Sequence, residues 1–168
     1  MEHRKHKRTI LFGKSGDEKS SFGNTLIGKQ HFKVSALSSV PMPVCETADI
    51  ATESGRNLKI VETPGIIEPM RSNMLDLVQS HFDFLAPGPN VIIIVLMPRR
   101  FSQEDETVVT ELFNFFGDDH FLEHTILVML RKSEIVDDCT NITEYMENTA
   151  SDSMKILYKR LWRPHCCR

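Results

Sequence analysis

The stretch TILFGKSGDEKSSFGN, residues 9–24, decides how this chain is interpreted. It opens with an apolar run, Thr9–Phe12, that predicts a buried strand, and its pattern from about Lys19 to Ile27 predicts a helix. A short loop that starts at Gly13 joins the two. This is the setting of a phosphate-binding loop, in which backbone N–H groups and the helix N-terminus surround a phosphate.

The stretch contains two Lys-Ser pairs, and spacing decides between them. The phosphate-loop pattern G-x-x-x-x-G-K-[ST] needs about five residues between the strand and its lysine. Lys14 comes too early, whereas Gly13, Lys19 and Ser20 fit as the first glycine, the lysine and the hydroxyl that binds Mg²⁺. The candidate site also includes the rest of the loop, whose backbone would line the phosphates: Lys14, Ser15, Asp17 and Glu18.

Glu18 occupies the position where the pattern has its second glycine. Glycine there adopts angles that other residues avoid, and it lets the backbone approach the phosphates. Glu18 and its neighbour Asp17 instead add negative charge, and two unit charges ~4 Å apart repel by roughly 4 kcal/mol at an effective dielectric of ~20. An inward carboxylate would weaken phosphate binding by about three decades. A carboxylate turned to solvent would have a far smaller effect, and both orientations stay open.

A second segment points to the same chemistry. Residues 58–61 predict a buried strand, and ETPG, Glu62–Gly65, follows it where a nucleotide switch has Asp-x-x-Gly. In that role the acid holds magnesium through water and the glycine N–H meets the γ-phosphate. Ser20 and Glu62 are therefore the candidate metal ligands. A simple Pro-Gly turn is the alternative interpretation.

The remaining pattern predicts an α/β layered fold, because strand-like runs alternate with helical ones. Residues 91–97 are apolar at every position, as in a strand buried on both faces, and residues 125–130, TILVML, predict another buried strand. Helices are expected over 70–85, from Ser102 onwards and over about 142–162. The SQED sequence at Ser102 places Asp105 at the third helical position of a capping box.

Composition limits the classes of partner. The length of 168 residues suits one domain, which we place at 8–168 behind a basic tail at 1–7. A net charge of −3 is too small to indicate nucleic acid. Four cysteines without C-x-x-C spacing or a preceding signal peptide predict reduced thiols and a cytoplasmic location. The basic tail and Cys166-Cys167 leave peripheral attachment to intracellular membranes open, although a solvated tail and unmodified thiols are expected.

The sequence HFLEH, residues 120–124, matches the zinc-protease signature H-x-x-E-H. That signature requires a helix, which brings both histidines to one face. Here the segment follows a predicted helix stop and leads directly into a predicted strand, so a polar connector is expected.

Three segments together resemble a known family. They are GKSGDEKSSFGNTLIGKQHF (13–32), VETPGIIE (61–68) and LAPGPNVIIIVLMPRRFSQEDETVVTELFNFFG (85–117). They resemble the immunity-associated GTPases, the GIMAP family with its avirulence-induced-gene (AIG) type G domain. The third segment is the most specific, and the resemblance covers residues 8 to about 150. It implies a P-loop GTPase fold of three layers, with a mixed, mostly parallel sheet and helices on both faces.

The resemblance also implies ligands and partners. It implies GTP or GDP with Mg²⁺, homo- or hetero-oligomers with related G domains formed through the nucleotide face, and slow or partner-dependent hydrolysis. Carried over position by position, it implies phosphate contacts at Gly13, Gly16, Lys19, Ser20 and Ser21. It further implies a second switch at Glu62 and Gly65 and guanine recognition at Arg131, Lys132 and Glu134.

The chain departs from the family pattern in several places. Glu18 replaces a glycine, Glu62 replaces an aspartate, and VPMPVCE lacks the first-switch threonine. Ile66 stands where a glutamine would orient the attacking water. The family's next strand and base-contacting loop are expected beyond Arg168. Two functions therefore stay open: GTP binding with slow hydrolysis, and a non-catalytic G-domain module that pairs with related GTPases.

Overall fold

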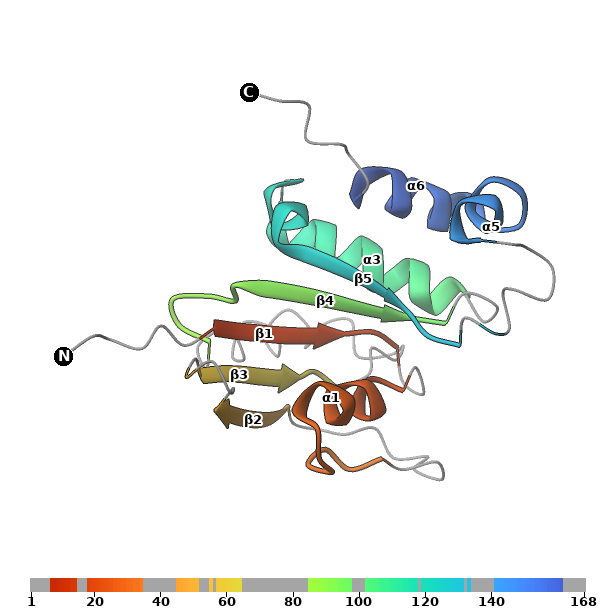
Figure 1. The fold of residues 1–168 in the computed structure, drawn as a ribbon. Coiled ribbons are helices and arrows are strands. Elements are labelled where there is room, and N and C mark those ends of the chain that lie inside the picture. Colours follow the sequence, from red (N-terminus) through yellow and green to blue (C-terminus); the bar gives the residue numbers. More distant parts are fainter. Residues whose placement is uncertain are drawn as a thin grey trace.

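The computed structural model describes residues 7–14, 18–34, 45–51, 55, 57–64, 85–97, 102–117, 119–131, 133 and 141–161. In these ranges five strands form one sheet in the order β2-β3-β1-β4-β5 (Figure 1). Their bounds are β1 Lys7–Phe12, β2 Glu46–Ala51, β3 Asn57–Glu62, β4 Val91–Leu96 and β5 Thr125–Met129. Strand β2 runs antiparallel to β3, and the other neighbours are parallel.

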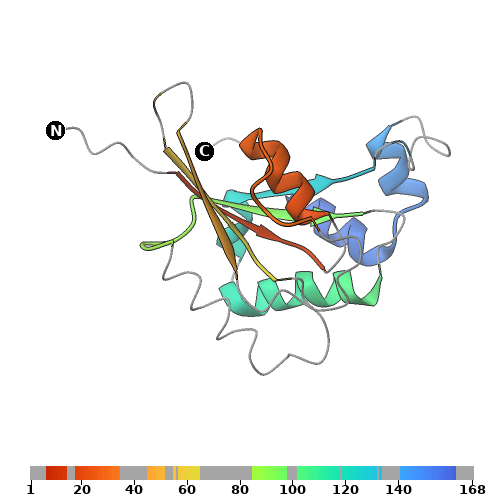
Figure 2. The same ribbon diagram turned by 90° about the horizontal axis from the view of Figure 1, so that it is seen from below.

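Helices lie on both faces of this sheet (Figure 2). Helix α1 (Lys19–Ile27) covers one face and α3 (Gln103–Phe116) the other. Side chains of α5 (Ile142–Asn148) and α6 (Asp152–Leu161) share one apolar cluster with α3, whereas α1 packs over a second cluster. The alternation of strand side chains separates the clusters, since Ile10 and Phe12 belong to the first and Leu11 to the second. The predicted three-layer fold is thereby confirmed.

Several predicted elements are confirmed, two of them in detail. Helix α1 has the predicted bounds, and Gly28 ends it in a left-handed conformation. Helix α3 begins with the predicted capping box between Ser102 and Asp105. The helix predicted over 70–85 lies outside the described residues, apart from Leu85 in a turn.

The structure corrects three expectations. Strand β2 was not anticipated, because ETADIA consists mostly of Glu, Asp and Ala, which are depleted in strands, and Ala48 is its one buried residue. Strand β5 is not buried on both faces: Ile126 is 52% exposed, because β5 is an edge of the described sheet. The single helix expected over 142–162 is two helices, since the Ser151 hydroxyl accepts a hydrogen bond from the Met154 N–H and starts α6 anew.

Two negative findings apply to the described ranges only. No helix there is long and apolar enough to cross a membrane. No group of three or more His, Cys, Asp and Glu side chains there is arranged to hold a metal ion. HFLEH forms the 3-10 helix η2 (Asp119–His124), with both histidines exposed.

Candidate functional site

The candidate site lies where β1 and β3 end. The two strands run parallel to each other, and Leu11 pairs with Glu62. The loop after β1 and the last residue of β3 therefore come together at the carboxyl ends of the strands. Helix α1 starts at the same end of the sheet (Figure 1). In open α/β sheets ligands bind at the carboxyl ends of the strands, which is this end.

Lys19 is the first residue of α1, and its side chain lies over the loop. It is 5% exposed, and its Nζ donates to the backbone oxygen of Lys14 at 2.8 Å. Gly13 makes room for this arrangement. A Cβ on Gly13 would lie 2.5 Å from the Val95 oxygen of β4 and 3.3 Å from Lys19 Cδ. A side chain at Gly13 would therefore push both β4 and the lysine away from the loop.

The other lysine of the loop has a different environment. Lys14 Nζ lies 2.7 Å from Asp105 Oδ2 and 3.2 Å from Ser102 Oγ, both at the start of α3. Lys14 is 8% exposed and Asp105 is fully buried. This side chain therefore anchors the loop to α3, 91 residues away in the sequence.

Ser20 and Glu62, the predicted metal ligands, are in direct contact. Ser20 Oγ donates to Glu62 Oε1 at 2.6 Å, and Glu62 is 1% exposed. The second oxygen, Glu62 Oε2, is buried without a hydrogen-bond partner. An orphaned carboxylate oxygen beside a hydroxyl is a donor pair that Mg²⁺ accepts, because Mg²⁺ prefers oxygen ligands and takes only one or two carboxylates. The two residues therefore fit a magnesium ion.

Burial raises the pKa of Glu62, and the Glu46 charge adds to the rise, while the Ser20 hydrogen bond and the Lys19 charge oppose it. Cys45, directly before β2, shares this environment. Burial raises the pKa of its thiol, Glu62 adds to that rise and Lys19 opposes it. The thiol therefore stays protonated at neutral pH and is a poor nucleophile.

Glu18, whose orientation the sequence does not determine, pairs with Arg131. Arg131 Nε donates to Glu18 Oε1 at 3.1 Å, and its terminal guanidinium nitrogen donates to the same oxygen. Arg131 comes two residues after β5 ends, in the segment where guanine recognition was expected. Of the other predicted site residues, Ser21 lies in α1. The rest are outside the described residues: Ser15, Gly16, Asp17, Gly65, Lys132 and Glu134.

Sequence reasoning missed two residues at this site. Asp105 was predicted only as a helix cap, and Cys45 only as a thiol. The contact of Asp105 with Lys14 has no local signal, because it depends on how α3 packs against the loop. The nearest signal in the sequence was Lys14 itself, a lysine in the loop that does not fit the phosphate-binding position.

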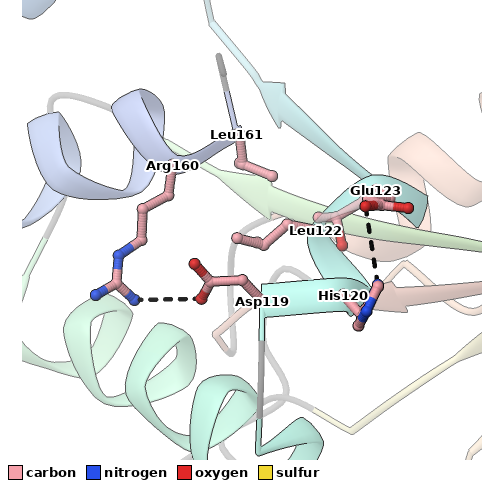
Figure 3. A pocket seen from close by; sticks show the side chains of 7 residues that line it. Asp119, His120, Leu122, Glu123, Arg160 and Leu161 are labelled. Carbon is pink, nitrogen blue, oxygen red and sulfur yellow. Dashed lines mark ion pairs between the residues drawn. The ribbon is translucent and has the colours of Figure 1, made fainter. Parts of the chain in front are cut away.

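A separate pocket of about 370 Å³ lies beside η2 (Figure 3). Its polar side chains pair with each other: Arg160 lies 4.0 Å from Asp119, and His120 lies 3.8 Å from Glu123. Helix η2 ends directly before β5 begins, so this pocket is at the opposite end of β5 from Arg131. It therefore does not contribute to the candidate site.

Replacing Glu62 by glutamine is expected to stabilise the nucleotide-free protein. Because the pKa of Glu62 is raised, its ionisation disfavours the native state, and this effect develops as the pH rises from about 4 through the native pKa. Glutamine keeps an acceptor for Ser20 and has no charge. We expect a gain of about 1 kcal/mol at pH 8 and almost none at pH 4.5, measured by urea unfolding. The exposed Glu123→Gln is the control, and an equal gain at both pH values would contradict the prediction.

The sheet order, the loop between β1 and α1 and the acid at the end of β3 define an α/β protein of the P-loop GTPase fold. Solved structures of other proteins support this fold. Toc33 from Arabidopsis thaliana in complex with GDP and Mg²⁺ matches with a TM-score of 0.60 and 27% identity, over 74% of this chain and 50% of that one. Era in complex with MgGDPNP and ribosomal RNA matches with a TM-score of 0.62 over 94% of this chain and 48% of that one. At 16% identity, Era supports the fold alone.

The sequence profile of the AIG1 family matches residues 7–167, and the chain belongs to this family. GTPase IMAP family member 8 of Mus musculus is 28% identical over 90% of the chain. Immune-associated nucleotide-binding protein 4 of Arabidopsis thaliana is 26% identical over 91%. The chain spans 22% and 48% of these two relatives' lengths, respectively. The predicted family is thereby confirmed.

Proposed function

We propose that this chain binds a guanine nucleoside di- or triphosphate together with Mg²⁺. The observation that carries the proposal is the group formed by Lys19, Ser20 and Glu62. A buried ammonium and a buried carboxylate with one unpartnered oxygen lie on adjoining segments, at the edge where such sheets bind ligands. Buried charges of this kind concentrate at functional sites.

Each side chain has a definite role in this proposal. Lys19 exchanges the Lys14 carbonyl for β- and γ-phosphate oxygens, which accept stronger, charge-assisted hydrogen bonds. Ser20 and Glu62 hold the metal, Ser20 directly and Glu62 directly or through water. A bound magnesium ion supplies positive charge that neutralises the phosphates. Gly13 keeps the lysine close to the loop.

Guanine as the base is supported by relatives rather than by geometry. Toc33 at 27% identity is in complex with GDP, and the mouse relative is named a GTPase. Lys132 and Glu134, which follow Arg131 in the sequence, are the proposed base-contacting residues, with Glu134 accepting from guanine N–H groups. Slow hydrolysis and pairing with related G domains belong to the same proposal. A dimerisation-deficient Toc33 variant, 26% identical to this chain, supports pairing in this class of protein. The domain bounds and the cytoplasmic location stay predictions.

The second candidate is a non-catalytic G-domain module that acts by pairing. One observation favours it: Ser20 and Glu62 bind each other, and Lys19 binds its own loop, so the polar groups are largely satisfied without a ligand. Glu18 in place of glycine points the same way.

A titration with a fluorescent GTP analogue, with and without Mg²⁺, separates the two functions. We expect saturable binding at micromolar or lower concentration that weakens when Mg²⁺ is removed, with GTP competing and ATP not competing. Circular dichroism and a cooperative urea transition would show that the sample is folded. A folded sample that binds no analogue would overturn nucleotide binding and leave the pairing module.

A further inference from the structure

Two residues of this site have unusual backbone conformations. Among the described residues, Glu18 and Arg131 are the two non-glycine residues with positive φ, each at 57°. Side chains make this conformation unfavourable, so it persists where surrounding contacts require it. Glu18 is at the N-cap of α1, and its side chain makes no capping hydrogen bond. The Glu18 carboxylate oxygen that could cap the helix accepts a hydrogen bond from Arg131 instead.

The two unusual residues contact each other across 113 positions of sequence. Arg131 donates through Nε and through a terminal nitrogen to the single oxygen Glu18 Oε1. The two side chains are 36% and 39% exposed, so the pair lies at the surface of the site. Leu130 fixes the end of this segment, because its N–H donates to the Leu96 oxygen of β4 at 3.0 Å. Arg131 is therefore held beside the loop.

The Glu18–Arg131 ion pair keeps the carboxylate of Glu18 away from the ammonium of its neighbour Lys19 at the start of α1. The Lys19 ammonium donates to the Lys14 carbonyl, whereas the Glu18 carboxylate is held by Arg131. A glutamate next to the phosphate-binding lysine would otherwise be free to turn towards that lysine or towards the phosphates. Arg131 neutralises the glutamate and fixes its direction.

We propose that Arg131 is a positioning residue for Glu18: it holds the glutamate against the end of β5, so that the loop accepts a nucleoside polyphosphate although it lacks its second glycine. This proposal rests on the proposed nucleotide binding. It assigns the loop's tolerance of a glutamate at position 18 to a pair of side chains, 18 and 131, whose charges compensate each other.

The proposal predicts a pattern of four affinities. Arg131→Ala weakens binding of the GTP analogue by about tenfold, the order expected when one uncompensated charge lies ~6 Å from one phosphate charge at an effective dielectric of ~40, between the near-surface and bulk-water values. Glu18→Gln alone strengthens binding, because it leaves the positive charge of Arg131 uncompensated beside the polyanion. In the Glu18→Gln/Arg131→Ala double variant the loss shrinks to less than about threefold, because no negative charge remains to be controlled. The weakening by Arg131→Ala also diminishes in 0.5 M salt, as screening of an exposed charge requires.

The experiment measures these four proteins as full chains by fluorescence titration. Arg160→Ala is the matched control, because Arg160 is also an exposed arginine in a carboxylate pair but lies at the other end of β5. Urea unfolding of the nucleotide-free proteins gives a second readout. It is expected to show coupling between positions 18 and 131 without any ligand.

The outcomes are distinguishable. A wild-type chain that binds no analogue overturns the proposed function itself. A wild type that binds, with Arg131→Ala binding equally well, overturns the positioning role alone. Tighter binding by Arg131→Ala also overturns it, since that result would make the pair a latch that closes the site. Equal losses in the single and double variants would assign Arg131 a direct ligand contact instead and would equally refute the role proposed here.

Discussion

Replacing Lys19 by alanine is expected to weaken binding of a GTP analogue by at least about a hundredfold. In the proposed complex the ammonium donates to two phosphate oxygens, and hydrogen bonds to charged groups contribute about 1.5–3 kcal/mol each. Losing both corresponds to about two to four decades in Kd. The side chain is already buried and directed over the loop, so little conformational entropy opposes its contacts in the wild type. Titration of wild type and variant under identical Mg²⁺ and salt measures the difference.

Lys29→Ala is the matched control for this prediction. Lys29 is an exposed lysine just after α1, so its removal changes the net charge equally without altering the loop. We expect its affinity to stay within about threefold of the wild type, as for an exposed charge distant from the ligand. If Lys19→Ala and Lys29→Ala bind alike, Lys19 does not hold phosphate, and the role of the loop must be reconsidered.

The elements predicted well from sequence are those with strong local signals. The bounds of helix α1 and the start of α3 were both predicted correctly. Their signals are a loop glycine, Gly28 at the end of α1 and the SQED capping box, and each of these acts within a few residues. The apolar strand β4 was recognisable for the same reason. Strand β2 has no such signal. Its pairing with β3 is antiparallel and half solvated, and ETADIA is rich in Glu, Asp and Ala, which are depleted in strands, so the segment resembles a loop in sequence.

Within the described residues, the sequence indicated where in the fold the candidate site residues lie but not which contacts they make. The spacing correctly placed Lys19, and not Lys14, at the start of the helix. The direction of Glu18 depends on Arg131, and the use of Lys14 depends on Asp105. These partners lie 113 and 91 residues away. Such contacts follow from the packing of β5 and α3 against the loop, which no local pattern encodes.

Replacing Asp105 by alanine is expected to destabilise the nucleotide-free protein by about 3–5 kcal/mol, the range observed when one partner of a buried ion pair is removed. Asp105 is fully buried, and its Oδ2 accepts from Lys14 Nζ and from the Ser102 N–H, each at 2.7 Å. The variant therefore loses the capping contact and removes the charge of Asp105 from beside the nearly buried Lys14 ammonium. Urea unfolding at pH 7.5 measures the change.

Two further variants decide what the ion pair contributes. Asp119→Ala removes an exposed aspartate, 45% accessible and 4.0 Å from Arg160, and is expected to change stability by less than about 1 kcal/mol. The double variant Lys14→Met/Asp105→Leu removes both buried charges and should recover much of the stability lost in Asp105→Ala, because an apolar pair needs no desolvation of charge. Recovery of stability without recovery of nucleotide affinity would mean that the pair positions the loop rather than stabilising the fold. A loss in Asp105→Ala no larger than in Asp119→Ala would show that Lys14 does not depend on Asp105.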